Sequence, residues 1–378
     1  MGNLHLSHPR LSDFEARARR RLPFFCAEYL LSGTGEDRGL VRNAHALNSV
    51  TLTPRALRGD FVPKTQSHLF GQTYAHPFGV APVGATGLIW PGGEAALAQM
   101  GKNYNVPYCL STVAAQSPEA IGPLVEGFGW FQLYPLQDLG CRGDLVRRAR
   151  DAGFKVLVLT VDVPTRSRRE RQIKAGFTVP PKITPAMIWQ AMKCPAWSLQ
   201  FLRHGMPTFP SLTPYFEGMK QAEAYRAMAH ELHGRPDWSI IADLKRQWDG
   251  PLVIKGILRP DDAMRALGEG ADAVWVSNHG ARQIDAAPAP IDMLPAIRAA
   301  VGDGAKIIID SGINSGLDVA RALALGADFV FAGRAFLLGL AAFGVRGGAH
   351  VAEIFADDLK NVMIQLGAKT IADLRLAV

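Results

Sequence analysis

The chain has 378 residues, a net charge of +7, and 48% apolar against 20% charged residues. These values are typical of a globular protein with one large domain or two ordinary ones, and no apolar run reaches membrane-spanning length. The N-terminus lacks the basic and apolar stretches of a secretory signal, so we expect a cytoplasmic protein. Four scattered cysteines form no CxxC pair, which argues against a disulfide framework and against zinc, and we expect no metal.

Two basic clusters, at residues 17–21 and 166–171, account for part of the positive charge. Neither is accompanied by aromatic residues or a known recognition motif, so we expect no nucleic-acid partner. The first cluster is best explained as a solvated helix face. It belongs to a helical or extended segment, residues 1–75, that precedes the repeating part of the chain.

From about residue 78 onward, short apolar strands alternate with helical patterns. Near-continuous apolar strands are typical of a buried parallel sheet. We expect strands at residues 79–82, 107–110, 130–134, 156–161, 252–255, 273–276, 306–310 and 329–332. Eight such units predict an α/β fold of the (β/α)8 TIM-barrel type, with residues 1–378 forming a single domain. A doubly wound sheet is the alternative, but no GxGxxG motif follows the first strand.

Polar residues follow strand after strand, at the rim where a barrel has its active site. Each one alone could be a helix cap or a loop residue, but together they predict a functional rim. They are Ser111, Gln132, Tyr134, Thr160, Asp162, Lys255, Ser277, His279, Asp310 and Arg334.

A long insertion, residues 177–248, separates the fourth and fifth strands, where connections of about 2–6 residues are usual. It mixes tryptophan, phenylalanine and cationic residues, as at Trp189, Lys193 and Trp197. This composition suits a membrane interface or a partner protein, and equally a lid packed over the barrel.

The segment after the sixth strand, residues 277–283, carries the strongest chemical signal. His279 can move a proton near neutral pH, and Arg282 can grip a carboxylate with its planar fork of donors. A base beside an anion clamp is what chemistry at the α-carbon of an acid requires. After the last two strands, glycine-rich turns at residues 310–316 and 333–334 suit a phosphate group.

The segment Ser-Asn-His-Gly-Ala-Arg-Gln at residues 277–283 resembles the signature of the FMN-dependent α-hydroxy-acid oxidases and dehydrogenases. The resemblance extends from residue 22 to the C-terminal helices. Within the insertion, residues 195–207 look like the corresponding part of the membrane-associated mandelate and lactate dehydrogenases. This resemblance favours the membrane-interface interpretation and allows peripheral attachment to the inner face of the cell membrane.

The resemblance implies FMN as the cofactor and assigns its contacts. The backbone of Pro82, Val83 and Gly84 would lie against the flavin ring. The polar edge of the ring would contact Ser111, Gln132, Thr160, Lys255 and Ser277, and the phosphate would bind near Asp310, Ser311, Gly312, Asn314, Gly333 and Arg334. Members of the family usually carry arginine where this chain has Asn314, which predicts weaker phosphate binding.

The resemblance also implies the substrate contacts. Arg169 and Arg282 would hold the carboxylate with help from Tyr29, and Tyr134 would contact the hydroxyl. His279 would be the base, oriented by Asp162, with flavin N5 as the acceptor. The base could take the hydroxyl proton while hydride leaves, or it could take the α-proton to give a carbanion.

The sequence therefore predicts oxidation of an L-2-hydroxy acid to the 2-oxo acid, with electrons passed to quinone or another membrane acceptor. A soluble oxidase that releases hydrogen peroxide is the close alternative, and a flavin-free or non-catalytic phosphate-binding barrel is the alternative of another class. Val113 lies just after the second strand, where some members of the family that act on small substrates carry a bulky aromatic residue. The resemblance therefore implies room for a side chain larger than that of glycolate. The resemblance further suggests a homotetramer.

Overall fold

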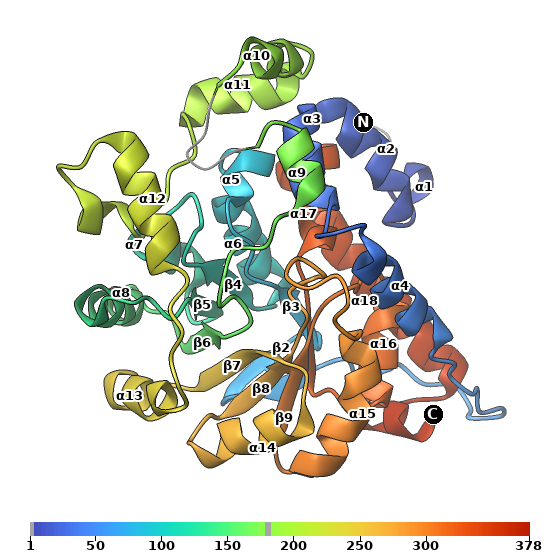
Figure 1. The fold of residues 1–378 in the computed structure, drawn as a ribbon. Helices are drawn as coiled ribbons and strands as arrows, with labels where there is room; N and C mark the ends of the chain where they lie inside the picture. Colours follow the sequence, from blue (N-terminus) through green and yellow to red (C-terminus); the bar gives the residue numbers. More distant parts are fainter. Residues whose placement is uncertain (1–3, 178–182) are drawn as a thin grey trace.

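Eight parallel strands close into a barrel in the computed structural model, which describes residues 4–177 and 183–378. Residues 178–182 of the expected insertion thus lie outside the described part. The strands are β3 (Phe78–Val80), β4 (Tyr108–Ser111), β5 (Gly129–Leu133), β6 (Val156–Thr160), β7 (Leu252–Ile257), β8 (Ala273–Val276), β9 (Lys306–Ile309) and β10 (Phe329–Ala332). They follow one another in chain order, and β10 pairs with both β9 and β3. The predicted TIM barrel is confirmed, and each expected strand overlaps an observed one (Figure 1).

The inside of the barrel is a packed aromatic core. Trp130, Trp275 and Phe331 are fully buried, with ring centroids 4.4–6.3 Å apart. A hairpin of β1 (Ser67–Leu69) and β2 (Gln72–Tyr74) adds Leu69 and Tyr74 to this core, and the Tyr74 hydroxyl accepts a hydrogen bond from Trp130 Nε1 at 3.2 Å. The interior is therefore filled, as in other barrels of this type, and a ligand is confined to the carboxyl ends of the strands.

Helices surround the barrel, and further helices precede its first strand and follow its last strand in the sequence (Figure 1). The N-terminal segment contains α1 (Leu4–Ser7), α2 (Ser12–Arg21), α3 (Phe24–Leu31) and α4 (Arg38–Ser49). The barrel helices before the insertion are α5 (Thr86–Ile89), α6 (Gly93–Tyr104), α7 (Pro118–Val125) and α8 (Leu139–Asp151). After β7 come α14 (Pro260–Gly268), α15 (Pro290–Val301), α16 (Gly316–Ala324), α17 (Arg334–Phe343), α18 (Val345–Leu366) and the 3-10 helix η2 (Ile371–Leu376).

The connection between β6 and β7 contains several helices of its own. They are α9 (Glu170–Lys174), α10 (Pro185–Met192), α11 (Pro195–His204), η1 (Thr213–Phe216), α12 (Gln221–Glu231) and α13 (Ser239–Gln247). The α10–α11 pair lies at the edge of the molecule, away from the strands (Figure 1). Trp197 of α11 anchors the pair, because it is buried, donates to the Leu88 carbonyl at 3.0 Å and packs edge-on against Phe25. None of the described helices combines the length and apolar character needed to cross a membrane.

Candidate active site

A cavity of about 400 Å³ opens at the carboxyl ends of the strands and gathers nearly all of the predicted site residues. Its wall includes Tyr29, Pro82, Val83, Gly84, Gln132, Tyr134, Thr160, Arg169, Lys255, His279, Arg282, Asp310, Ser311, Gly312, Asn314, Gly333 and Arg334. The other three predicted residues, Ser111, Asp162 and Ser277, lie behind this wall and hydrogen-bond to residues in it.

The predicted base is held by a buried carboxylate. His279 Nδ1 lies 3.0 Å from Asp162 Oδ1, which leaves Nε2 to exchange a proton. Burial alone would raise the pKa of Asp162, but His279 and Lys255 hold this pKa below its usual value, so Asp162 stays ionised. Gly256 permits this arrangement, because a Cβ there would come within 2.6 Å of Asp162 Cβ.

The loop that carries His279 has an unusual backbone. His279, Gly280 and Ala281 have φ angles of 56°, 63° and 59°, a left-handed run that is costly for side chains other than glycine. Asn278 stabilises the loop by accepting a hydrogen bond from the Ala281 amide at 3.0 Å. Its side chain also exchanges two hydrogen bonds with the side chain of Asn43, at 2.7 and 3.0 Å. The sequence analysis did not identify Asn43, since nothing local to α4 marks it as part of the site.

A buried ion pair fixes the predicted cation of the flavin site. Lys255 Nζ lies 2.8 Å from Asp310 Oδ2 and donates to Ser277 Oγ at 2.7 Å. It also lies over the Trp275 ring, 5.0 Å from its centroid. Ser277 itself is not part of the cavity wall, and its hydroxyl supports Lys255 by accepting the hydrogen bond from Nζ.

The cavity offers unsatisfied donors where the flavin edge is expected. Gln132 Nε2 and Thr160 Oγ1 are buried and have no hydrogen-bond partner among the described residues. Ser111 Oγ donates to Gln132 Oε1 at 2.9 Å and thereby orients the amide group with its nitrogen away from Ser111. Buried donors left without a partner are costly, so this wall fits a group with several acceptors, such as the pyrimidine edge of a flavin. Ser111 supports Gln132 and is not part of the cavity wall.

Two half-buried arginines form the cationic side of the cavity. Arg334 donates to the carbonyls of Ser32 and Gly280 at 3.2 and 2.6 Å, and Arg282 donates to the carbonyls of Ser32 and Tyr29. Burial lowers the pKa of Arg282 to about 10, with a contribution from Arg169. Burial and Arg282 lower the pKa of Arg334 to about 9. An anion placed between these two cations would raise both pKa values again, so the pocket favours a carboxylate or a phosphate.

The last two strand ends form the glycine-rich side of the cavity. Ser311 and Gly312 have positive φ angles of 79° and 98°, and Ser311 Oγ accepts a hydrogen bond from the Gly280 amide at 3.1 Å. Asn314 also lines the cavity, and its backbone amide donates to Asp318 Oδ2 at 3.0 Å. These backbone turns place main-chain atoms close to any bound phosphate.

Two tyrosines complete the wall. Tyr134 lies in the cavity, and burial together with Asp162 raises its pKa, so its phenol remains protonated and able to donate. The Tyr29 hydroxyl donates to the Gly84 carbonyl at 2.8 Å, while its ring lies 4.9 Å from the Arg282 guanidinium carbon. Tyr29 thus links the N-terminal segment to the barrel rim.

A second hollow of about 190 Å³ adjoins the cavity, and the two spaces share Tyr29, Gly84, Val113, Arg169, Leu232 and His233. The rest of its wall combines apolar side chains of the insertion, Phe177, Phe209, Tyr225 and Met228, with Arg166, Arg168 and other residues from outside the insertion. A lid or an interface was predicted here from the sequence, but none of these insertion residues was predicted as a site residue.

Comparisons with known proteins identify the family of this chain. The profile of the FMN-dependent dehydrogenases matches residues 18–378. The chain is 37% identical over 365 residues to the L-lactate dehydrogenase of Vibrio parahaemolyticus, with 96% of each chain covered. The crystal structure of the monotopic membrane protein (S)-mandelate dehydrogenase superposes with a TM-score of 0.91 at 32% identity, covering 97% of both chains. A mandelate oxidase structure gives a TM-score of 0.81 at 34% identity over 97% of this chain and 96% of that one. The chain therefore belongs to the family of FMN-dependent dehydrogenases.

Proposed function

We propose that this protein oxidises an L-2-hydroxy acid to the corresponding 2-oxo acid. The observation that carries the proposal is that a carboxylate-held base, His279, shares one cavity with the guanidinium of Arg282. A base near a carboxylate clamp can remove a proton from the hydroxyl or the α-carbon of a bound hydroxy acid.

Each residue then has a task. Arg282 and Arg169 bind the carboxylate, Tyr29 supports Arg282, and the Tyr134 phenol donates to the substrate hydroxyl. His279 accepts the proton at Nε2, and Asp162 orients the ring and stabilises its cationic form. FMN, when bound, supplies the two-electron acceptor.

The remaining wall would hold the cofactor. Lys255, Gln132 and Thr160 would contact the polar edge of the ring, and Lys255 would stabilise negative charge there. Ser277 and Ser111 would act through Lys255 and Gln132. The backbone of Pro82, Val83 and Gly84 would contact the ring, and the phosphate would be held by Asp310, Ser311, Gly312, Asn314, Gly333 and Arg334.

Measurement of the 2-oxo acid product tests the proposal. The FMN-loaded protein, mixed with an artificial dye and a panel of L-2-hydroxy acids, should form one 2-oxo acid per two-electron equivalent of dye reduced. Absence of any 2-oxo acid across the panel, in protein that retains FMN, would contradict the proposal.

The second hollow supports a substrate with an apolar side chain larger than hydrogen. Val113 lines both spaces, and the aromatic and aliphatic side chains of the second hollow suit a methyl, alkyl or phenyl group. Substrates named for the relatives, lactate and mandelate, both fall within this class.

The insertion supports a membrane-bound electron acceptor, such as quinone. Large apolar side chains of α10 and α11 are exposed: Ile188, Trp189, Met192, Leu199 and Leu202. Lys193 lies over the Trp189 ring at 5.0 Å, so a cation accompanies this apolar surface. Such a surface suits peripheral binding at a lipid headgroup region. Hydrogen peroxide formed in equal amount to the 2-oxo acid would instead identify an oxidase.

A further inference from the structure

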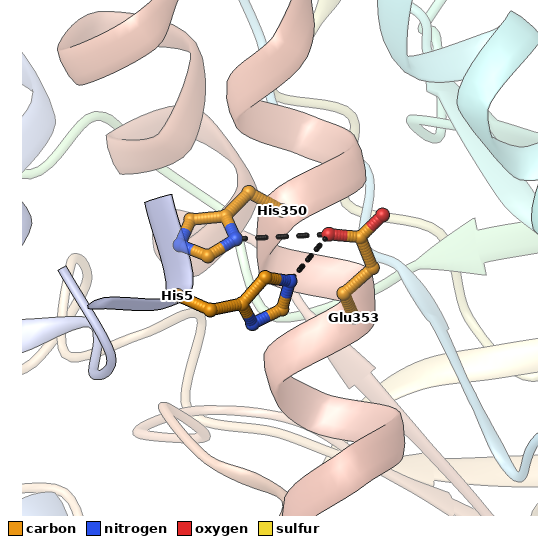
Figure 2. Close-up of side chains that lie close together, drawn as sticks. All are labelled: His5, His350 and Glu353. Carbon is orange, nitrogen blue, oxygen red and sulfur yellow. Dashed lines mark hydrogen bonds and ion pairs between the residues drawn. The ribbon is translucent and has the colours of Figure 1, made fainter. Parts of the chain in front are cut away.

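Two histidines and a glutamate converge outside the active-site cavity, where the N-terminal helix α1 meets the C-terminal helix α18 (Figure 2). His5 comes from α1, and His350 and Glu353 come from α18. His5 Nε2 lies 3.1 Å from Glu353 Oε2, and His350 Nδ1 lies 3.7 Å from the same oxygen. One possible ligand atom from each residue lies within 4.8 Å of the other two.

The separations match those of a tetrahedral metal site. Zinc bonds of about 2.0–2.2 Å place neighbouring ligand atoms roughly 3.3–3.6 Å apart. Of the two distances to Glu353 Oε2, one is slightly shorter and one slightly longer than this range. Small movements of the side chains would therefore bring the ligand atoms to tetrahedral spacing. Two imidazoles and one carboxylate suit zinc and its neighbours among the transition metals better than magnesium or calcium, which prefer oxygen ligands.

His350 is prepared for metal binding by its surroundings. Its Nε2 lies 2.9 Å from the His8 carbonyl and must donate to it, so in the neutral ring Nδ1 carries the lone pair. The residue is 2% exposed, and Nδ1 has no hydrogen-bond partner among the described residues. Phe14 stacks on the ring at 5.5 Å, which limits its rotation. A buried acceptor fixed toward a shared centre is what a metal ligand requires.

Glu353 is oriented in a similar way. The Tyr104 hydroxyl, at the end of α6, donates to Glu353 Oε1 at 2.5 Å. This bond leaves Oε2 directed toward the two imidazoles (Figure 2). Outer partners of this kind orient the ligands in known metal sites. The side chains of His5 and Glu353 are 45% and 39% exposed, which gives a metal ion and a water ligand access from solvent.

A metal at this place would also explain how α1 is held. None of the four residues of α1 is buried, so apolar packing contributes little to its position. We propose that His5, His350 and Glu353 bind a Zn²⁺ ion that links α1 to α18. The expectation of no metal rested on the cysteine pattern, and it did not consider histidines at opposite ends of the chain.

Zinc titration of the full-length, untagged, FMN-loaded protein tests this site. After treatment with a chelator, the wild type should take up one Zn²⁺ per chain and unfold at a higher temperature with zinc than without it. The variants His5→Gln and Glu353→Gln should lose this uptake and this shift. Tyr104→Phe, which removes only the outer hydrogen bond, should weaken zinc binding roughly tenfold.

His45→Gln is the matched control, because His45 is an exposed histidine on α4 and should leave zinc binding unchanged. His5→Gln is the decisive variant, since His5 is half exposed and its loss should not affect folding. A wild type that takes up no zinc, or a His5→Gln variant that binds zinc as the wild type does, would overturn the proposal. The flavin content and reduction by substrate should be equal in all of these proteins, so the result is independent of the proposed activity.

Discussion

The rim of the barrel and the α10–α11 pair differ in whether their side chains have interaction partners within the protein. At the rim, two ion pairs are formed within the protein, Lys255 with Asp310 and His279 with Asp162. On α10 and α11, large apolar side chains such as Trp189 and Leu202 are 57% and 81% exposed. The first region is constrained by internal contacts, whereas the second exposes an apolar surface. We therefore propose that the rim determines the reaction and that the α10–α11 pair determines where it occurs.

The largest effect is expected from the base. His279→Ala should slow flavin reduction by substrate about 10²–10⁴-fold, because the variant lacks Nε2, the atom that accepts the proton from the substrate. FMN content should remain that of the wild type. Asp162→Asn should cause a smaller loss, since the imidazole stays in place but loses its carboxylate partner. Stopped-flow absorbance checks both, and an unchanged rate for His279→Ala would remove this residue from the reaction.

Loss of the buried cation should reduce stability. Lys255→Met leaves Asp310 buried without its partner, which should lower the free energy of unfolding by about 3–5 kcal/mol. Chemical denaturation of the two FMN-free proteins measures this difference. Equal stability of variant and wild type would show that the Lys255–Asp310 pair contributes nothing net to the fold. Lys255→Arg, which retains the charge, should lose less.

A change at the carboxylate clamp should act on binding. Arg282→Lys keeps a cation but loses the planar fork, so about 1.5–3 kcal/mol of charged hydrogen bonding to the substrate should be lost. This corresponds to a roughly 10- to 100-fold weaker interaction, visible in kcat/KM. Arg259→Lys, at an exposed pair on the surface, serves as the control. An Arg282→Lys variant with unchanged kcat/KM would indicate that the carboxylate binds elsewhere.

The exposed apolar surface of α10 and α11 should affect membrane binding and should have the smallest effect on the reaction. Replacing Trp189 and Leu202 by serine should abolish co-sedimentation with anionic lipid vesicles, since each buried apolar side chain contributes roughly 1.5–3 kcal/mol. Oxidation measured with a soluble dye should be unchanged. Leu139→Ser, an exposed leucine on α8, is the control. Retained vesicle binding in the double variant would break the proposed division between rim and α10–α11 pair.

The rim was largely predictable from the sequence because it follows from strand positions. The local sequence pattern is enough to predict a polar residue at the end of a buried strand, and Lys255 and His279 were predicted in this way. Whether a side chain lines the cavity or lies behind its wall depends on three-dimensional packing, so the sequence did not distinguish Lys255, which lines the cavity, from Ser277, which hydrogen-bonds to it. Contacts between distant segments leave no local signal, and for this reason Asn43 and the His5–His350–Glu353 cluster were missed.

We propose that one rim holds FMN and a hydroxy acid so that His279 can start electron transfer between them. Anaerobic mixing of the yellow, FMN-loaded protein with paired L- and D-2-hydroxy acids tests it most directly. The flavin absorbance should bleach with at least one L-acid that has an apolar side chain and should persist with its D-enantiomer. Persistent flavin absorbance with every acid, in protein that contains FMN, would contradict the account.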